Sequence, residues 1–149
     1  METINYNGKQ IPLLIGLGHI KCKLMDTPRG MKEVNVFQVQ QCHLDKDLLA
    51  TNPDAAVKDL WARFFKYLNN FSYYIKTIFA HNLGGFDGYF LYKGLLNYDP
   101  TKVETIIDQH NKFIIIKYNN IVFKDSKKLL KFVLQYQYNL PEVILDLRY

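Results

Sequence analysis

The sequence contains little cysteine, with 2 cysteines among 149 residues. Two thiols cannot build the disulfide framework on which small secreted domains depend, so that class of protein is excluded. The cysteines at positions 22 and 42 and the histidines at 19 and 43 also lack the compact paired spacing of zinc ligands. We therefore interpret Cys22 and Cys42 as buried or incidental thiols.

Long hydrophobic runs are missing as well. None approaches the roughly 20 apolar residues that a helix needs to cross a bilayer, which predicts that the chain has no membrane partner. The N-terminus shows no basic region followed by an apolar core and a small-residue cleavage site, which argues against secretion. We therefore expect an intracellular or organellar protein.

Apolar and aromatic residues are plentiful. The hydrophobic share is 48% and the aromatic share 15%, which favours a packed globular fold over disorder. A chain of 149 residues fits one domain, or a piece of something larger, and is far too short for a complete multidomain enzyme. The net charge of +5 and the pI near 9.1 favour a polyanionic partner.

Lysines alternate with aromatic rings in the second half of the chain, at Lys112-Phe113, Lys117-Tyr118, Phe123-Lys124, Lys127-Lys128 and Lys131-Phe132. Rings can stack on bases while ammonium groups meet phosphates, so this pattern is typical of nucleic-acid binding. An ordinary solvated strand face produces the same pattern. Both interpretations stay open.

The order of elements predicts an α/β domain. Strands are expected at 11–20 and 34–40, 73–80, 103–107, 113–118 and 121–123. A turn at 108–111 joins two of the later strands, and the Asn119-Asn120 pair predicts a tight hairpin between the last two. Asn52 as N-cap and Pro53 at the first helical position predict a helix with Leu60, Trp61, Phe64, Phe65 and Leu68 on its buried face. Further helices are expected from about Phe86, and from Ser126 until Pro141. We predict one mixed sheet with flanking helices.

The run from His81 to Phe90 follows a predicted strand and contains the glycine pair Gly84-Gly85. Glycines let the chain turn back, so that Asn82 and Asp87 can face the same cavity. A carboxylate at such a strand end can hold Mg²⁺ together with water and substrate phosphates. Taken alone, Asp87 also fits a helix cap beside a glycine turn, which is a common arrangement.

This run resembles the second exonuclease motif of family B DNA polymerases, in the protein-primed branch of organellar linear plasmids and some viruses. The likeness lies in Asn82 and Phe86-Asp87. The segment from Ile121 to Ser126 resembles a second block of that branch, an aromatic residue followed by a variable residue and Asp-Ser. Glu2-Thr3-Ile4 resembles the end of the first exonuclease motif, whose leading aspartate would fall one position before Met1.

The resemblance implies a truncated ribonuclease H-like fold, with residues 1–149 forming a partial 3′–5′ proofreading exonuclease domain. It implies that Glu2 and Asp87 are catalytic carboxylates that bind Mg²⁺. Contacts to the single-stranded primer 3′ end are implied for Asn82, Phe86, Phe90, His81 and Ser126. Asp125 is expected to orient the loop. For Phe90 core packing stays open, and so does a frayed terminus for Glu2.

The match is incomplete. The family's third motif, a tyrosine four residues before an aspartate, does not occur, since Asp146 has Glu142 in the tyrosine position. The polymerase domain is absent from these residues. We therefore expect a fragment of a mitochondrial or viral DNA polymerase that is inactive alone, with the remainder of a polymerase as a possible partner. Two alternatives stay open, a non-catalytic single-stranded nucleic-acid-binding module and an unrelated α/β interaction domain.

Overall fold

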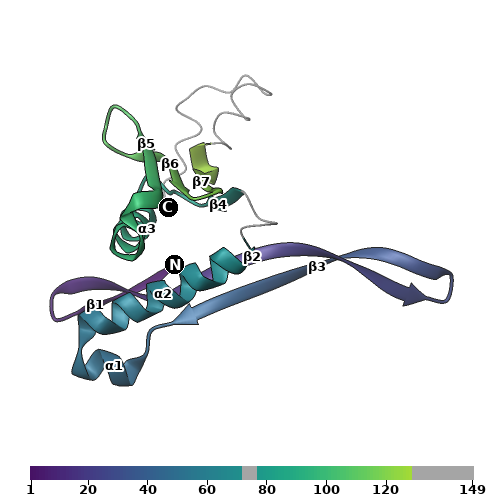
Figure 1. Cartoon of the computed structure of the whole chain (residues 1–149), viewed down its shortest axis with the longest axis horizontal. Coiled ribbons are helices and arrows are strands. Elements are labelled where there is room, and N and C mark those ends of the chain that lie inside the picture. The colour runs from purple at the N-terminus through teal and green to yellow at the C-terminus, as the bar shows by residue number, and fades with distance from the viewer. Residues whose placement is uncertain (72–76, 129–149) are drawn as a thin grey trace. The chain divides into compact units, whose positions relative to one another are not determined.

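The computed structural model describes residues 1–71 and 77–128 (Figure 1). The chain divides into two compact units, Met1–Phe64 and Phe65–Tyr149, with the boundary inside a helix. The described residues combine helices with two β-sheets, so the predicted α/β class is confirmed. The predicted single sheet is wrong, because within the described part of the chain the first three strands pair only with one another. Short turns join these strands, and strands so joined pair locally.

The first unit contains a three-stranded antiparallel sheet in the order β1-β2-β3, followed by helices. Its elements are β1 (Glu2–Tyr6), β2 (Lys9–Thr27), β3 (Gly30–His43), α1 (Lys46–Thr51) and the start of α2 (Pro53–Phe71). Asn7 and Gly8 turn the chain with φ of 50° and 79°, and Gly30, with φ of 103°, closes the turn between β2 and β3. Both predicted early strands exist, but they are much longer than predicted.

The helices of this unit begin at side-chain caps. Asp45 accepts hydrogen bonds from the backbone N–H groups of Asp47 and Leu48, at 2.9 and 3.0 Å, and so starts α1. Asn52 accepts from the N–H of Ala55 at 3.1 Å, which confirms the predicted cap of α2. The predicted apolar face of α2 is buried along its length, at Leu60, Trp61, Phe64, Phe65 and Leu68.

The second unit contains a four-stranded mixed sheet in the order β4-β7-β6-β5, in which β4 and β7 are parallel and the other pairs antiparallel. Its elements after α2 are β4 (Thr77–Ala80), α3 (Phe86–Tyr98), the 3-10 helix η1 (Pro100–Lys102), β5 (Val103–Ile107), β6 (Phe113–Tyr118) and β7 (Ile121–Asp125). Tyr118 pairs with Ile121 across Asn119-Asn120, which confirms the predicted tight hairpin.

Tyr118 joins the helices of the second unit to its sheet. Its ring, 1% exposed, lies 5.8 Å from the ring of Phe65 in α2 and 6.3 Å from that of Tyr98 in α3. The ring of Tyr92 in α3 lies 5.1 Å from Phe113 at the start of β6. These aromatic contacts hold α3 against β6, which fixes the first turn of the helix relative to the sheet.

Two predictions fall largely outside the described residues. Of the predicted strand at 73–80, β4 covers 77–80, and of the helix predicted from Ser126, helical backbone covers 126–128. Among the described helices, none combines the length and the apolar character that crossing a membrane requires.

Candidate functional site

At one end of its strands, the four-stranded sheet brings together three connecting segments. Ala80 ends β4 and Asp125 ends β7, and the two residues pair in parallel, so the segments that follow them leave the sheet side by side. Strand β6 runs antiparallel to β7 and therefore begins at the same edge, after the 108–112 turn. We call this end of the strands, where β4 and β7 finish, the β4/β7 edge. It is defined by residues 81–87, 108–112 and 125–128.

The glycine turn at 81–85 lies close against the sheet. Gly84 donates its backbone N–H to Oδ2 of Asp125 at 2.9 Å, and Gly85 donates to the carbonyl of Asn82 at 2.9 Å. Asn82 itself adopts a left-handed backbone with φ of 57°, a conformation that asparagine tolerates. A Cβ atom at Gly84 would lie 3.0 Å from the carbonyl oxygen of Phe113. A larger residue at position 84 would therefore have to displace the Phe113 backbone slightly.

The start of α3 is packed just as closely. A Cβ atom at Gly88 would overlap the carbonyl oxygen of Leu83, and it would lie 3.1 Å from the ring of Phe113. Leu83 is fully buried, which anchors the turn from below. The first turn of α3, with Phe86 and Asp87, is thereby held in one position relative to the sheet edge.

Asp125 links the two segments that follow the parallel strands. Its side chain is 4% exposed, and among the described residues it is the one charged side chain that is buried. Its Oδ1 accepts the backbone N–H groups of Lys127 at 2.9 Å and Lys128 at 3.4 Å, capping the helical backbone that begins at Ser126. Its Oδ2 accepts the N–H of Gly84. The expectation that Asp125 orients the loop agrees with these contacts.

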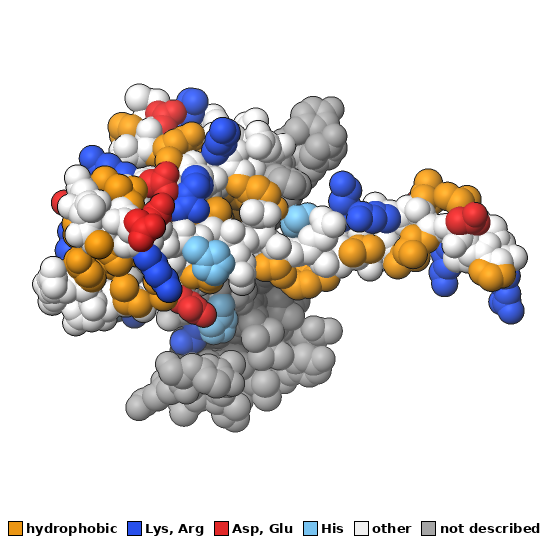
Figure 2. Space-filling view, turned by 90° about the horizontal axis from the view of Figure 1, so that it is seen from below, with side chains coloured by type: hydrophobic (Ala, Val, Ile, Leu, Met, Phe, Trp, Pro, Cys, Tyr) orange, Lys and Arg blue, Asp and Glu red, His pale blue; other side chains and the backbone are white. Residues whose placement is uncertain are grey.

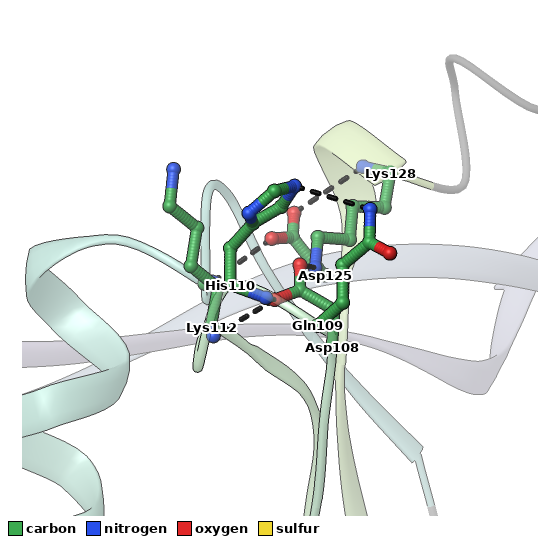
Figure 3. Close-up of polar contacts among 7 residues, drawn as sticks. Asp108, Gln109, His110, Lys112, Asp125 and Lys128 are labelled. Carbon is green, nitrogen blue, oxygen red and sulfur yellow. Dashed lines mark hydrogen bonds and ion pairs between the residues drawn. The ribbon is translucent and has the colours of Figure 1, made fainter.

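A second carboxylate, Asp108, organises the turn between β5 and β6 (Figure 3). Its Oδ1 accepts the N–H groups of His110 at 2.8 Å and Lys112 at 3.0 Å, and its Oδ2 lies 3.0 Å from Nζ of Lys128. The hydrogen bond from Lys112, then the Lys128 ammonium, lower the pKa of Asp108 to about 2. Sequence reasoning recognised this turn but not the ion pair, because nothing local in the sequence brings Lys128 beside Asp108.

Most of the predicted site residues lie at the β4/β7 edge or on α3. His81 and Asn82 are exposed, Asp87 is half-buried in the first turn of α3, and Ser126 is half-buried with Oγ 3.5 Å from the carbonyl of Ala80. Glu2 belongs to the first unit, where it is exposed on β1 and pairs with Leu14. The alternative of a frayed terminus for Glu2 is wrong, because its backbone is part of the sheet.

The predicted aromatic contacts differ in accessibility. Phe86 is 51% exposed and Tyr89, which the sequence analysis did not single out, is 58% exposed. Phe90 is 9% exposed, and its ring lies 4.6 Å from Phe86 and 5.8 Å from Tyr89, in edge-on contacts. Phe90 therefore packs in the core and supports two exposed rings. The sequence signal available for Tyr89 was its spacing of three residues from Phe86, which places both rings on one side of a helix.

The carboxylates do not form a complete two-ion site within the described residues. No group of three or more His, Cys, Asp or Glu side chains in 1–71 and 77–128 is arranged to hold a metal ion. Asp125 uses both oxygens for backbone N–H groups, and Asp108 is bound to Lys128. A single carboxylate holds Mg²⁺ only where water and phosphate supply most of the ligands.

We compared the chain with models of protein families, with curated proteins and with solved structures, and none of the three comparisons yields a match.

Proposed function

We propose that the chain is the 3′–5′ exonuclease region of a family B DNA polymerase of the protein-primed type, with a ribonuclease H-like fold. We further propose that the β4/β7 edge binds the 3′ end of single-stranded DNA. One observation supports this most strongly. The two blocks that carry the resemblance, 82–87 and 125–126, follow adjacent parallel strands and are joined by the hydrogen bond from Gly84 to Asp125.

The exposed groups at and next to this edge have the chemistry needed to bind single-stranded DNA. Phe86 and Tyr89 offer ring faces, each supported from below by Phe90. Stacking of a base on such a ring contributes about 1–3 kcal/mol. Lys112, which is exposed, and Asn82 can contact a phosphate and a base edge beside the rings.

Asp87 is the proposed Mg²⁺ ligand of this unit, and Glu2 is the second carboxylate that the resemblance implies. Mg²⁺, when bound, neutralises phosphate oxygens and lowers the pKa of a coordinated water. The residues of the chain hold the strand: the rings position the terminal base, and the rigid first turn of α3 sets the direction of the Asp87 carboxylate.

A second candidate is a module that binds single strands without cleaving them. Both Asp125 oxygens are engaged by backbone N–H groups, so this carboxylate serves the loop, while exposed rings and lysines remain available. Binding that weakens with salt, with no loss of nucleotides in Mg²⁺, is the behaviour expected of it.

Binding and cleavage of a 3′-tailed oligonucleotide, with and without Mg²⁺, separate the candidates. Phe86→Ala is expected to weaken binding roughly 5- to 150-fold, the equivalent of one lost stacking contact. Leu96→Ala, at the other end of α3 and 38% exposed, is the matched control. Asp87→Asn is expected to abolish degradation in Mg²⁺ and to leave binding within a few-fold.

Three results distinguish the outcomes. Degradation that survives Asp87→Asn contradicts the proposed metal ligand. Binding that depends on Phe86, without degradation by the unaltered chain, supports the non-catalytic module. Binding that is equally strong in Phe86→Ala and Leu96→Ala, or no binding at all, contradicts both candidates and leaves the unrelated α/β interaction domain.

A further inference from the structure

Strands β2 and β3 form a long two-stranded ribbon. They pair in unbroken register from Leu14 with His43 to Thr27 with Gly30. Strand β1 pairs with β2 only as far as Leu14, so beyond this point the ribbon consists of two strands (Figure 1). A two-stranded ribbon buries little surface of its own. Its outward side chains therefore reflect contact with solvent or with a partner more than packing within the chain.

The charged side chains of the ribbon are divided between its two faces. Residues that pair across the strands share a face, and successive residues along a strand alternate between faces. Lys21 and Lys23 of β2 therefore share a face with Lys32 of β3, and we call it the lysine face. The two carboxylates of the ribbon, Asp26 and Glu33, lie on the opposite face. The lysine face is therefore free of negative charge.

The exposed part of the lysine face is basic, although apolar residues lie between the lysines. All three lysines are exposed. Three apolar residues of this face are half-buried: Leu17, Val34 and Val36. The valines pair directly with Lys23 and Lys21, whose alkyl stems can cover them while the ammonium groups stay in water. Met25, 48% exposed, is the one large apolar side chain that stands exposed on this face.

The tip of the ribbon adds a fourth cation. Arg29 is exposed in the turn between β2 and β3, where its backbone N–H donates to Oγ1 of Thr27 at 3.3 Å. Oγ1 of Thr27 donates in turn to the carbonyl of Gly30 at 2.6 Å, which holds the turn. Figure 2 shows Lys and Arg side chains along the ribbon and at its tip. At about 3.3 Å per residue, the basic stretch from Lys21 to the tip is about 20 Å long.

We propose that the lysine face binds double-stranded DNA, with the ribbon in the major groove and its four cations against phosphates. The major groove is about 12 Å wide and admits a two-stranded ribbon, whose strands lie about 4.8 Å apart. Because the lysines come from both strands of the ribbon, they can reach phosphates on both walls of the groove. Asp26 and Glu33, on the opposite face, stay away from the phosphates.

Other nucleic acids fit this face less well. Proteins that bind single strands without sequence preference place aromatic rings among the cations, because bases stack on the rings. The lysine face, all of whose residues the structure describes, carries no Phe, Tyr or Trp, and Phe37 lies on the opposite face. The major groove of duplex RNA is deep and narrow and does not admit the ribbon. Contacts to phosphates alone predict binding that does not depend on DNA sequence.

This proposal concerns the first unit alone, and it does not rest on the exonuclease proposal. The test is fluorescence anisotropy of the whole chain with a labelled DNA duplex about two turns long, in EDTA so that the duplex is not degraded. Each phosphate contact steepens the slope of log K against log salt by about 0.9, which is about eightfold in K for a tenfold change in salt. The four cations therefore predict a slope of about −3.6.

Lys21→Gln/Lys23→Gln removes two of the four cations. It is expected to weaken duplex binding by about 10- to 60-fold at about 0.1 M salt and to reduce the slope by about 2. Lys46→Gln/Lys58→Gln is the matched control, because it removes the same charge from exposed lysines of α1 and α2 in the same unit. Screening by salt should keep its effect on the affinity below about threefold. Both double variants change exposed residues, so their circular dichroism spectra should match that of the unaltered chain.

Four outcomes overturn the proposal. The first is that the chain does not bind duplex DNA, and the second is that the two double variants lose equal affinity. The third is that duplex RNA binds as tightly as duplex DNA, which contradicts the placement in the major groove. The fourth is that the chain binds vesicles of anionic lipid through Lys21 and Lys23 but does not bind the duplex, which assigns the face to membranes.

Single-stranded DNA separates this proposal from the one for the β4/β7 edge. Lys21→Gln/Lys23→Gln should leave the affinity for a single strand within a few-fold, whereas Phe86→Ala should leave the affinity for the duplex within a few-fold. Parallel loss of single-strand and duplex binding in the lysine variant would overturn the assignment of the lysine face to double-stranded DNA. Loss of duplex binding alone supports it, whatever the outcome for Phe86.

Discussion

Replacing Asp125 tests whether one buried carboxylate holds the β4/β7 edge together. In Asp125→Ala the N–H of Gly84 loses its acceptor in a part-buried site, which costs about 1–3 kcal/mol. Loss of the cap at Lys127 adds about 1 kcal/mol. Part of this lost stability is recovered, because the alanine variant no longer has to desolvate a buried carboxylate on folding. We expect the free energy of unfolding to fall by about 1–3 kcal/mol in total.

Asp125→Asn separates the two contributions. An amide group has one acceptor oxygen and one donor nitrogen, so it can serve the cap or Gly84 but not both. Asparagine caps helices about as well as aspartate. We therefore expect Asn to keep the cap, to lose the bond to Gly84, and to destabilise the chain by about 1–2 kcal/mol less than Ala does.

Urea unfolding followed by far-UV circular dichroism measures the free energies, and amide hydrogen exchange measures the Gly84 N–H directly. In the unaltered chain this N–H should be protected, and in Asp125→Asn it should exchange much faster while the N–H of Lys127 stays protected. A Gly84 amide as protected in Asp125→Asn as in the unaltered chain would refute the reasoning. So would a loss below about 1 kcal/mol in Asp125→Ala.

Three further predictions concern the same unit. The pKa of Asp108 is lowered from 3.8 to about 2, so this carboxylate stabilises the fold above pH about 4 and loses the effect as the pH falls toward 2. Asp108→Asn should remove that part of the pH dependence of the unfolding free energy. A titration midpoint near pH 4 for the Asp108 carboxyl, measured by NMR, would contradict the prediction. Gly88→Ala should cost about 3 kcal/mol in urea unfolding, since its Cβ overlaps the Leu83 carbonyl, whereas exposed Lys93→Ala on the same helix should stay within about 0.5 kcal/mol. Phe90→Ala should cost about 3–5 kcal/mol of unfolding free energy and half-exposed Phe86→Ala far less, so equal losses would contradict the assigned roles.

Local chemistry predicted the start of α2 and the tight turn between β6 and β7. Asn52 followed by Pro53 indicated the start of α2, and the Asn119-Asn120 pair indicated the β6–β7 hairpin, and both are confirmed. Helix α1 was missed, because Lys46–Thr51 is too short to show a helical period even though Asp45 caps it. Local signals therefore succeed where a cap or turn pair adjoins segments long enough to show their own period.

Local signals did not predict which strands pair with one another, or how far the pairing extends. Strands β2 and β3 stay paired as far as Thr27 and Gly30 although most side chains there are exposed, because each strand is held by hydrogen bonds to the other and not by a buried face. The division into two sheets also depends on pairing, since β4 finds its parallel partner in β7, far along the chain. At the candidate site, the sequence indicated the glycine turn and α3, but the ion pair from Lys128 to Asp108 depends on the same long-range arrangement.

The contact between Gly84 and Asp125 changes how the sequence resemblance has to be tested. An Asp-Ser block after a strand and a glycine turn after its parallel neighbour are needed together for this fold, because each satisfies the hydrogen-bonding groups of the other. Such a pair can be retained for structural reasons whether or not the edge binds DNA. Variants of Asp125 therefore report on the fold, and loss of activity in them does not identify a catalyst. Phe86 and Asp87 lie in the first turn of α3, and only variants of such residues, with unfolding free energies matched to the unaltered chain, can separate a nuclease from a scaffold.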